Sequence, residues 1–286
     1  SIVFIHGFTG HPHRTWSQRR GVNRDQNEDD DDDVGKPIYW PRDLVPVTVP
    51  NARVPTYGYD THIRHWAGSA IDKSTVYDIA WDFLVTLEAE RRVETSRPLL
   101  FVAHSLGGII VKEALRRSRG CEAYQGHLRS IYNFTSGIIF FGTPHGGADP
   151  QGLILHVIEQ TIRAIGFKVN EQIVNTLLPT AERLKELHNE FGPMARQRNW
   201  TIFSFQEQYR VKALGDKKVV EDTASCLNDP TIEVTQHIAR NHIEMYRFSE
   251  LDDVEYRKVA RAIDWVLEGI ATLTPRDKKR VIDADQ

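Results

Sequence analysis

Cysteine is scarce in this sequence: among 286 residues there are two, Cys121 and Cys226. Two thiols so far apart fit neither a disulfide framework nor the paired spacing of a zinc ribbon. A chain of this length can bury a hydrophobic core without disulfides or metals. The scarcity of cysteine therefore favours a reducing compartment, and we expect the cytoplasm.

Long apolar runs and an excess of one charge are also lacking. No stretch is apolar for long enough to cross a bilayer, and a formal net charge of −3 offers no broad basic surface to nucleic acid. The absence of a G-x-x-x-x-G-K-[ST] motif excludes a phosphate-binding P-loop. The first residues lack a methionine and a basic leader, so we expect other domains in a longer parent chain.

Two segments contain metal-ligating residue types without the spacing that a metal site needs. The acidic insertion 21–36 contains the run Asp29–Asp33, but no frame places glycine sixth and an acid twelfth, as a calcium loop requires. His11 and His13 have no third ligand at a recognisable spacing. We interpret the insertion as a solvated loop and expect neither a metal nor a cofactor.

Apolar runs alternate with segments of helical periodicity along most of the chain. This alternation predicts an α/β fold with a mostly parallel central sheet covered by helices on both faces. The predicted strands are 2–5, 52–59, 99–103, 136–141, 200–205 and a short sixth at 231–234. One helical segment is predicted to start at a capping box of Thr75 and Asp78 and to continue to residue 90. Further helical segments are predicted at 109–117, 153–196 and 254–270.

No linker or internal repeat divides the chain, so we expect a single domain over residues 1–286. The segment 150–198, between the fourth and fifth strands, lies where a helical cap over a site would be. Its apolar residues would either line a pocket or cover the sheet, and the sequence leaves both possibilities open. Residues 251–286 are expected to form a closing amphipathic helix and a solvated tail.

The segment Ala103-His104-Ser105-Leu106-Gly107 joins an apolar strand to a helix and has a serine at its centre. A sharp turn of this kind exposes the serine hydroxyl above the sheet, and small residues two positions away accommodate the strained backbone. The start of the helix points N–H groups toward developing negative charge. We therefore predict Ser105 as a nucleophile rather than as a simple helix cap. Ala103 replaces the usual glycine.

A nucleophilic serine on such a turn uses two N–H groups to bind the oxyanion, one of them from the residue after the serine. Leu106 supplies this first N–H. The second comes from a loop after an earlier strand, and His6-Gly7-Phe8-Thr9-Gly10 follows the opening strand. We predict Phe8 as the second donor.

The general base is expected to be a late histidine, because the acid and then the histidine follow the serine in this arrangement. Only His237 and His242 follow the last predicted strands, and we favour His242 because it comes after a plausible final strand. Its role is to take the serine proton and return it to the leaving group. His104 is interpreted as a structural residue packed beside the turn.

The acid that orients this histidine is expected after the strand 200–205. Glu207 lies just past its end, whereas Asp216 and Asp222 lie further along the same loop. We choose Glu207, and the two aspartates remain alternatives. The acid holds the imidazole in one tautomer and stabilises the imidazolium.

Five motifs occur together in a characteristic order: VFIHGFTG (3–10), YWPRDL (39–44), YGYD (57–60), AHSLG (103–107) and FGTPHG (141–146). From Ile2 to about Phe248 the chain resembles the lipase-like α/β-hydrolase domains of the serine-active-site-containing phospholipid-remodelling proteins. These are related to the GPI inositol deacylases. Similar domains occur at the N-terminus of fungal NACHT-bearing, NLR-like proteins.

The resemblance implies an α/β-hydrolase fold and a serine esterase or lipase that acts on acyl lipids, with peripheral membrane contact. It places Ser105 as nucleophile, His242 as base, Phe8 and Leu106 as oxyanion donors, and Glu207 at the glutamate that ends the family's Ser-Phe-Tyr-Glu stretch. Ala103, Gln206 and the acidic insertion depart from the family pattern. Two alternatives remain: a catalytically weak or idle hydrolase-fold domain with an interaction or regulatory role in an NLR-like protein, and a thioesterase or small-ester esterase.

Overall fold

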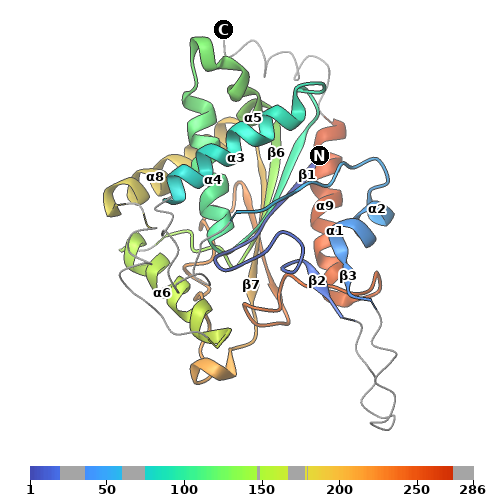
Figure 1. Ribbon diagram of the computed structural model, residues 1–286, viewed down its shortest axis with the longest axis vertical. Coiled ribbons are helices and arrows are strands. Elements are labelled where there is room, and N and C mark those ends of the chain that lie inside the picture. The colour runs from blue at the N-terminus through green and yellow to red at the C-terminus, as the bar shows by residue number, and fades with distance from the viewer. Residues whose placement is uncertain (20–35, 60–74, 147–148, 167–177, 179, 273–286) are drawn as a thin grey trace, which may run out of the picture.

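The computed structural model describes residues 1–19, 36–59, 75–146, 149–166, 178 and 180–272. Within this part, six strands form one sheet in the order β4-β1-β5-β6-β7-β8, and all neighbouring pairs are parallel (Figure 1). The prediction of a parallel α/β sheet is confirmed. The strands are β1 (Ile2–Ile5), β4 (Thr56–Tyr57), β5 (Leu99–His104), β6 (Thr135–Phe141), β7 (Thr201–Glu207) and β8 (Glu233–Ile238).

The chain changes direction across the sheet between β1 and β5. From β1 it passes to β4 on one side, crosses to β5 on the other side, and then adds β6, β7 and β8 outward. Ligands of open parallel sheets bind outside the carboxyl ends of the strands at such a switch point. The segments His6-Gly7 and His104-Ser105, which follow or end β1 and β5, lie at this position.

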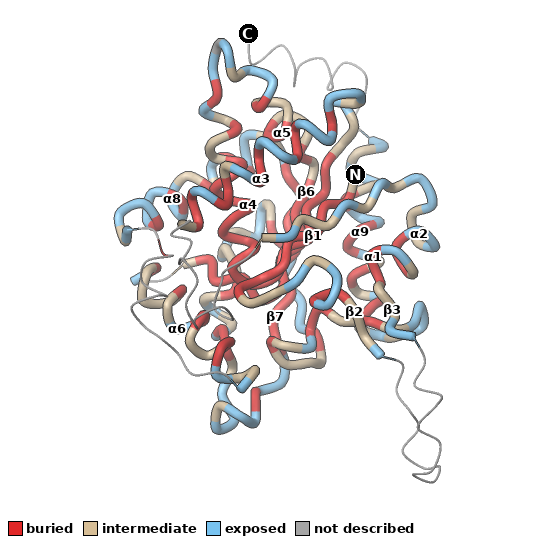
Figure 2. The backbone as a smooth tube through the Cα atoms, in the orientation of Figure 1, coloured by how far each residue is buried: buried red, intermediate tan, exposed pale blue. Residues whose placement is uncertain are grey.

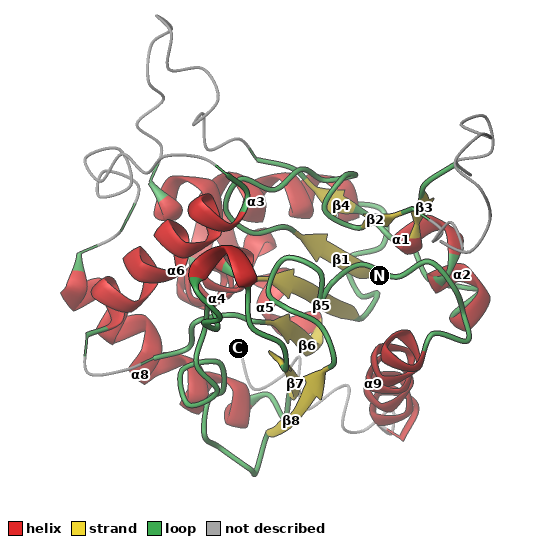
Figure 3. Ribbon diagram, turned by 90° about the horizontal axis from the view of Figure 1, so that it is seen from below, coloured by secondary structure: helices red, strands yellow, loops and turns green. Residues whose placement is uncertain are grey.

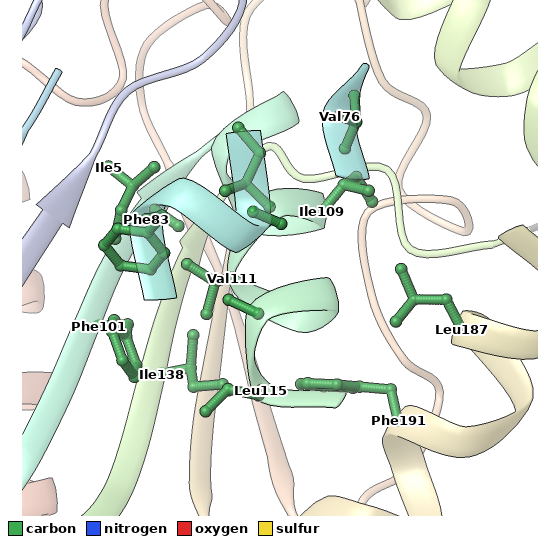
Figure 4. Packing of buried hydrophobic residues seen from close by; sticks show 14 of the residues in the cluster. Ile5, Val76, Phe83, Phe101, Ile109, Val111, Leu115, Ile138, Leu187 and Phe191 are labelled. Atoms are coloured by element: carbon green, nitrogen blue, oxygen red, sulfur yellow. The ribbon is translucent and has the colours of Figure 1, made fainter. Parts of the chain in front are cut away.

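Five of the helices in the described part of the chain cover one face of the sheet, with α3, α4, α6 and α8 on the same side in Figure 3. They are α3 (Val76–Arg91), α4 (Leu106–Gly120), α5 (Arg129–Phe134), α6 (Pro150–Ala164) and α8 (Ala181–Gln197). Alternate strand residues such as Ile5, Phe101 and Ile138 point toward them (Figure 4). The strands β1, β5, β6 and β7 are buried along most of their length, while the outward sides of the helices are exposed (Figure 2).

The opposite face packs against α1 (Trp40–Asp43), α2 (Val45–Thr48) and α9 (Val254–Thr272). Phe4 of β1 makes edge-to-face contacts with Trp16 and Trp40, with ring centroids 5.1 Å and 4.9 Å apart. The Trp40 indole N–H donates to the Tyr246 carbonyl (2.9 Å). This bond fixes the segment after β8 against the sheet. A short antiparallel ribbon of β2 (Ser17–Gln18) and β3 (Ile38–Tyr39), which was not predicted, borders this face.

The predicted capping box of α3 is confirmed, because Thr75 and Asp78 bond to each other's backbone N–H. The predicted strand 52–59 is wrong in extent, since only Thr56 and Tyr57 pair in the β4 ladder. Ahead of these residues the carbonyls of Arg53 and Pro55 still accept the N–H groups of Ile2 and Phe4 (2.8 Å and 3.0 Å), but Pro55 has no N–H to donate in return.

The predicted strand 231–234 is displaced in the structure. β8 begins at Glu233 and continues through Ile238, in register with β7 up to Glu207. His237 therefore lies within the strand instead of after it. β8 is an edge strand with four exposed central residues, so its sequence lacks the apolar run of a buried strand.

The helical segment 153–196 contains α6 and α8, while residues 167–177 and 179 lie outside the described residues. Leu187 and Phe191 of α8 pack toward α4 (Figure 4). These helices thus cover the core, and their role as a cap stays a prediction. Most of the acidic insertion 21–36 and the tail 273–286 also lie outside the described residues. Among the helices that the structure describes, none has the length and apolarity needed to cross a membrane.

Candidate active site

Ser105 forms the turn between β5 and α4. Its backbone has φ 51° and ψ −124°, which residues other than glycine seldom adopt. Two hydrogen bonds hold this turn: the Ser105 N–H donates to the Phe141 carbonyl (2.9 Å), and the Thr143 hydroxyl donates to the Ser105 carbonyl (3.2 Å). The structure around β6 thus maintains a strained backbone at the predicted nucleophile. Such strain is concentrated at functional sites.

The loop after β1 passes very close to this turn. A Cβ atom added to Gly7 would lie 2.9 Å from the Ser105 Cβ and 2.8 Å from His104 Nδ1, so this approach requires glycine. The Gly10 N–H donates to the Gly7 carbonyl (3.0 Å) and closes a tight turn. Within it Thr9 has φ 59°, a rare conformation for a β-branched residue.

Phe8 and Leu106, the predicted oxyanion donors, lie in this loop and in the first turn of α4. Neither backbone N–H donates a hydrogen bond to any residue that the structure describes. Leu106 is the first residue of α4, where an N–H has no partner within the helix and the helix dipole is positive. Two unpaired N–H groups from these two segments match the composition of an oxyanion hole.

His242 follows β8, and its side chain is fully buried. Its ring packs against the turn after β6: a Cβ atom added to Gly142 would lie 2.8 Å from the ring atoms Cε1 and Nδ1. Gly142 also has φ +52°, which favours glycine independently. The Phe141 carbonyl accepts the Ser105 N–H, and the neighbouring Gly142 packs against the His242 ring. The turn after β6 therefore contacts both Ser105 and His242.

His104 packs against His242 and Tyr246, with ring centroids 4.8 Å and 4.0 Å away. Its Nε2 donates to the His242 carbonyl (3.2 Å). Burial, together with the nearby His242, holds the pKa of His104 well below its ordinary value, so this ring is neutral. The expectation of a structural residue beside the turn agrees with these contacts. What the sequence did not reveal is that His104 binds the backbone of His242.

Glu207 is the last residue of β7, and its side chain is 1% exposed. Its Oε1 lies 3.6 Å from His242 Nδ1, slightly longer than a hydrogen bond. The same carboxylate accepts the N–H of Val220 (2.6 Å) and the backbone N–H of His242 (3.1 Å). These two amides hold the carboxylate against the imidazole, and contacts of this kind often tighten only when substrate binds.

The two alternative acids lie elsewhere. Asp222 pairs with Lys218 Nζ (2.6 Å) and with His237 Nε2 (3.4 Å). Asp216 lies in an exposed turn with φ 57°. The structure therefore brings Ser105, His242 and Glu207 together, and it places Asp222 and His237 in a separate surface pair.

Gln206, which differs from the tyrosine of the proteins that the sequence resembles, makes two side-chain hydrogen bonds in this chain. Its amide donates to the Asp222 carbonyl (2.6 Å) and to the Ser225 hydroxyl (3.0 Å). These bonds hold the loop after β7, from which Val220 binds Glu207. The sequence offered no signal for these contacts, because they join residues on separate parts of a loop.

The site is closed in this structure. Ser105 is 1% exposed and His242 is not exposed at all. Neither ring nitrogen of His242 has a hydrogen-bond partner among the described residues. The same part of the chain contains no group of three or more His, Cys, Asp or Glu side chains suited to a metal ion. The groups assembled at Ser105 are equipped for nucleophilic attack and proton transfer.

No family model matches the chain. It is 27% identical over 220 residues to Protein SERAC1 of Danio rerio and 26% identical over 207 residues to Protein SERAC1 of Homo sapiens. Each match covers 72% of this chain. The chain spans about 30% of the length of these curated relatives.

Among solved structures, the chain is similar to the Bacillus licheniformis lipase BlEst2. The mature form has a TM-score of 0.50 at 14% identity, covering 86% of this chain and 85% of the lipase. The propeptide form has a TM-score of 0.51 at 14% identity, covering 91% of this chain and 49% of that chain. Together with the parallel sheet and the turn at Ser105, this similarity shows that the chain has the α/β-hydrolase fold.

Proposed function

We propose that this protein is a serine hydrolase of carboxylic esters, with Ser105 as nucleophile, His242 as general base and Glu207 as the orienting acid. The observation that carries the proposal is the buried Glu207–His242 contact beside the β6 turn that also binds the strained Ser105. A carboxylate and an imidazole enclosed together next to a nucleophile are the components of acyl transfer. The fold and the two SERAC1 matches support this assignment.

The first half of the reaction forms an acyl-enzyme. The Ser105 Oγ attacks the ester carbonyl carbon while His242 takes the hydroxyl proton. The carbonyl oxygen becomes an oxyanion and binds the N–H groups of Phe8 and Leu106. One such donor contributes roughly 3–4 kcal/mol to the transition state. The carbon–oxygen ester bond then breaks, and His242 returns the proton to the leaving alcohol.

The second half hydrolyses the acyl-enzyme. Water attacks the Ser105 ester, His242 removes a proton from this water, and the acid product leaves as Ser105 regains its proton. Glu207 faces His242 Nδ1, so Nε2 is the nitrogen left to exchange protons with Ser105. In this role the carboxylate keeps the imidazole in one tautomer and stabilises its protonated form.

Acyl lipids are the proposed substrates. The support comes from the resemblance of the five sequence motifs and from the similarity in fold to a lipase. A series of p-nitrophenyl esters of increasing chain length tests this point. A lipid hydrolase prefers the longer chains, whereas a small-ester esterase prefers acetate or butyrate esters. Parallel assays with acyl thioesters test the thioesterase alternative.

The decisive experiment is labelling with a fluorophosphonate probe, which reacts covalently with activated serines. We expect the wild type to be labelled and Ser105→Ala to be unlabelled, with His242→Ala labelled far more slowly. Ser136→Ala, a serine of β6 outside the site, is the matched control and should label like the wild type. Labelling of Ser105→Ala at the wild-type rate would assign the nucleophile to another residue.

The burial of Ser105 and His242 favours a second candidate, a hydrolase-fold domain that turns over slowly and serves an interaction or regulatory role. The same experiment separates the two. A folded wild type that remains unlabelled, and that hydrolyses none of the esters above, would support this second candidate over the first.

A further inference from the structure

His6 is a buried histidine directly after β1, and the reaction proposed above gives it no role. It is 1% exposed and begins the loop His6–Gly10, called the oxyanion loop below because it contains the predicted donor Phe8. A Cβ atom added to Gly107 of α4 would lie 2.5 Å from the His6 carbonyl oxygen, so this loop starts in contact with the turn of the predicted nucleophile. Buried imidazoles are normally hydrogen-bonded, and the partners of this one show what it holds in place.

Two backbone contacts fix the tautomer of the His6 ring. Its Nδ1 lies 2.9 Å from the Gly7 carbonyl oxygen, which can only accept a hydrogen bond, so Nδ1 carries a proton. Its Nε2 accepts the backbone N–H of Tyr59 (3.3 Å), so Nε2 carries none. The Tyr59 ring stacks on the imidazole with centroids 4.3 Å apart, and the Tyr59 hydroxyl donates to the His6 carbonyl (2.9 Å). These contacts hold a neutral imidazole in one orientation.

The Gly7 carbonyl that His6 binds belongs to the same peptide unit as the Phe8 N–H. This carbonyl also accepts the Gly10 N–H (3.0 Å), so two donors hold it. The peptide is planar and trans, so its N–H points in the direction opposite to its carbonyl. Fixing the carbonyl therefore fixes the direction of the Phe8 N–H, which has no partner among the described residues.

We propose that His6 is a positioning residue of the oxyanion hole: its Nδ1–H holds the Gly7–Phe8 peptide so that the Phe8 N–H stays directed at the oxyanion. This inference rests on the proposed serine-hydrolase function. Without His6, the Gly7 carbonyl keeps only the Gly10 donor, and the peptide is free to turn. A donor directed at the oxyanion acts mainly in the transition state, so a misdirected one lowers kcat while KM changes little.

Two variants of similar shape test the hydrogen bond. His6→Asn and His6→Leu both remove the ring, but only asparagine has an N–H at the position of Nδ1. In ester hydrolysis we expect kcat of His6→Leu to fall at least about tenfold, up to the ~10²–10³-fold that a lost donor costs, with KM within about threefold. His6→Asn should keep a kcat at least about fivefold above that of His6→Leu. A role in packing alone predicts the reverse order, because burying leucine costs less than burying an amide.

His13→Leu is the matched control. The His13 ring stacks on Tyr39 with the same centroid distance of 4.3 Å, but it is exposed and lies outside the oxyanion loop. Its kcat and KM should stay within about twofold of the wild-type values. Thermal unfolding of the three variants verifies that each remains folded.

Nitrogen-15 NMR of the histidine side chains gives a readout that does not depend on activity. The His6 signals are identified by their loss in His6→Asn. At pH 7 we expect a protonated Nδ1 and an unprotonated Nε2 in the wild type, as the two backbone contacts require. If a variant fails to fold, this measurement on the wild type decides whether His6 holds the Gly7 carbonyl.

The possible failures of the inference and of the proposed function are distinct. An active wild type with His6→Asn no more active than His6→Leu would overturn the role of His6 and leave the serine-hydrolase function intact. A His6 ring protonated on Nε2 would overturn this role as well. A wild type that neither hydrolyses the esters nor reacts with the fluorophosphonate probe would instead overturn the proposed function, and with it the role of His6 in catalysis.

Discussion

Among the residues that the structure describes, two histidine–carboxylate pairs have nearly equal separations but very different exposure to solvent. His242 Nδ1 lies 3.6 Å from Glu207, and His237 Nε2 lies 3.4 Å from Asp222. The first pair is 0% and 1% exposed, and the second is 47% and 46% exposed. Distance alone therefore does not distinguish a candidate catalytic pair from a surface contact.

The two pairs differ in whether backbone N–H groups bind the carboxylate. Glu207 accepts two backbone N–H groups from separate loops, and one of them belongs to its own histidine partner. Asp222 is instead bound by the flexible side chain of Lys218. Exposed pairs contribute about 0–1 kcal/mol because water screens them. In a buried site the same groups interact far more strongly and cannot exchange their partner for water.

The largest expected effect comes from removing each histidine in turn. His242→Ala should lower kcat/KM by ~10⁴ or more, because the serine loses its base. His237→Ala should change kcat/KM by less than about twofold. Steady-state hydrolysis of a p-nitrophenyl ester by both variants measures this contrast. A similar loss in both variants would remove the functional distinction between the two pairs.

Replacing each carboxylate in turn should show the same contrast between the two pairs, with a smaller loss of activity. Glu207→Gln retains the shape but not the charge that stabilises the protonated imidazole, and we expect kcat to fall ~10²–10⁴-fold. Asp222→Asn should leave kcat nearly unchanged. Thermal unfolding of both variants verifies that each remains folded. A greater loss of kcat in Asp222→Asn would assign the acid role to Asp222.

A matched pair of glycine substitutions tests how closely the buried pair is packed. Gly142 and Gly215 both have positive φ, but a Cβ would contact the His242 ring only at Gly142, whereas Gly215 has nothing within 4 Å. Backbone strain should lower the free energy of unfolding of both alanine variants by about 1–2 kcal/mol. Overpacking against His242 should lower the free energy of unfolding of Gly142→Ala by about 1–3 kcal/mol more. The kcat of this variant should fall about tenfold or more, while Gly215→Ala stays active. Equal losses of stability and activity would show that the His242 contact is not restrictive.

The smallest effect concerns the stability of the exposed pair. Partial burial raises the pKa of Asp222, but Lys218 and His237 outweigh it and hold this pKa below its ordinary value. A depressed carboxyl pKa adds stability above the unfolded-state pKa, and this stability is lost as pH falls through the folded-state pKa. Asp222→Asn should therefore destabilise the protein by less than about 0.5 kcal/mol at pH 7, and by less at pH 3 than at pH 7. Urea unfolding at both pH values, with and without 1 M salt, measures the difference; an effect that survives high salt would contradict a screened surface contact.

Much of the framework is readable in the sequence because the buried strands are short apolar runs with clear ends. The strand 2–5 is confirmed, and β5 and β6 differ by one residue from the predicted strands 99–103 and 136–141. The edge strand β8 was predicted at the wrong position, because an exposed strand carries a weak apolar signal. The capping box of α3 was predictable because it depends on residues three positions apart.

Some features of the candidate site are also readable from local sequence patterns, and others are not. The turn at Ser105 is a local motif, and so is the glycine-containing loop after β1, so a linear pattern identifies both. The choice among Glu207, Asp216 and Asp222 is not local. It follows from the path of the loop after β7, which Gln206 and Val220 hold through bonds to residues distant in the sequence.

By itself, the sequence determined the parallel α/β class, the turn at Ser105 and the order of the proposed nucleophile, acid and base, which are Ser105, Glu207 and His242. Only the tertiary structure decided which carboxylate faces His242, that Gly142 leaves room for its ring, and that the backbone of Tyr59 binds the ring of His6. The physical reason is the separation along the sequence of the residues that interact. Apolar periodicity and turn chemistry act over a few residues, whereas the pairing of buried polar groups depends on which distant segments the folded sheet brings into contact.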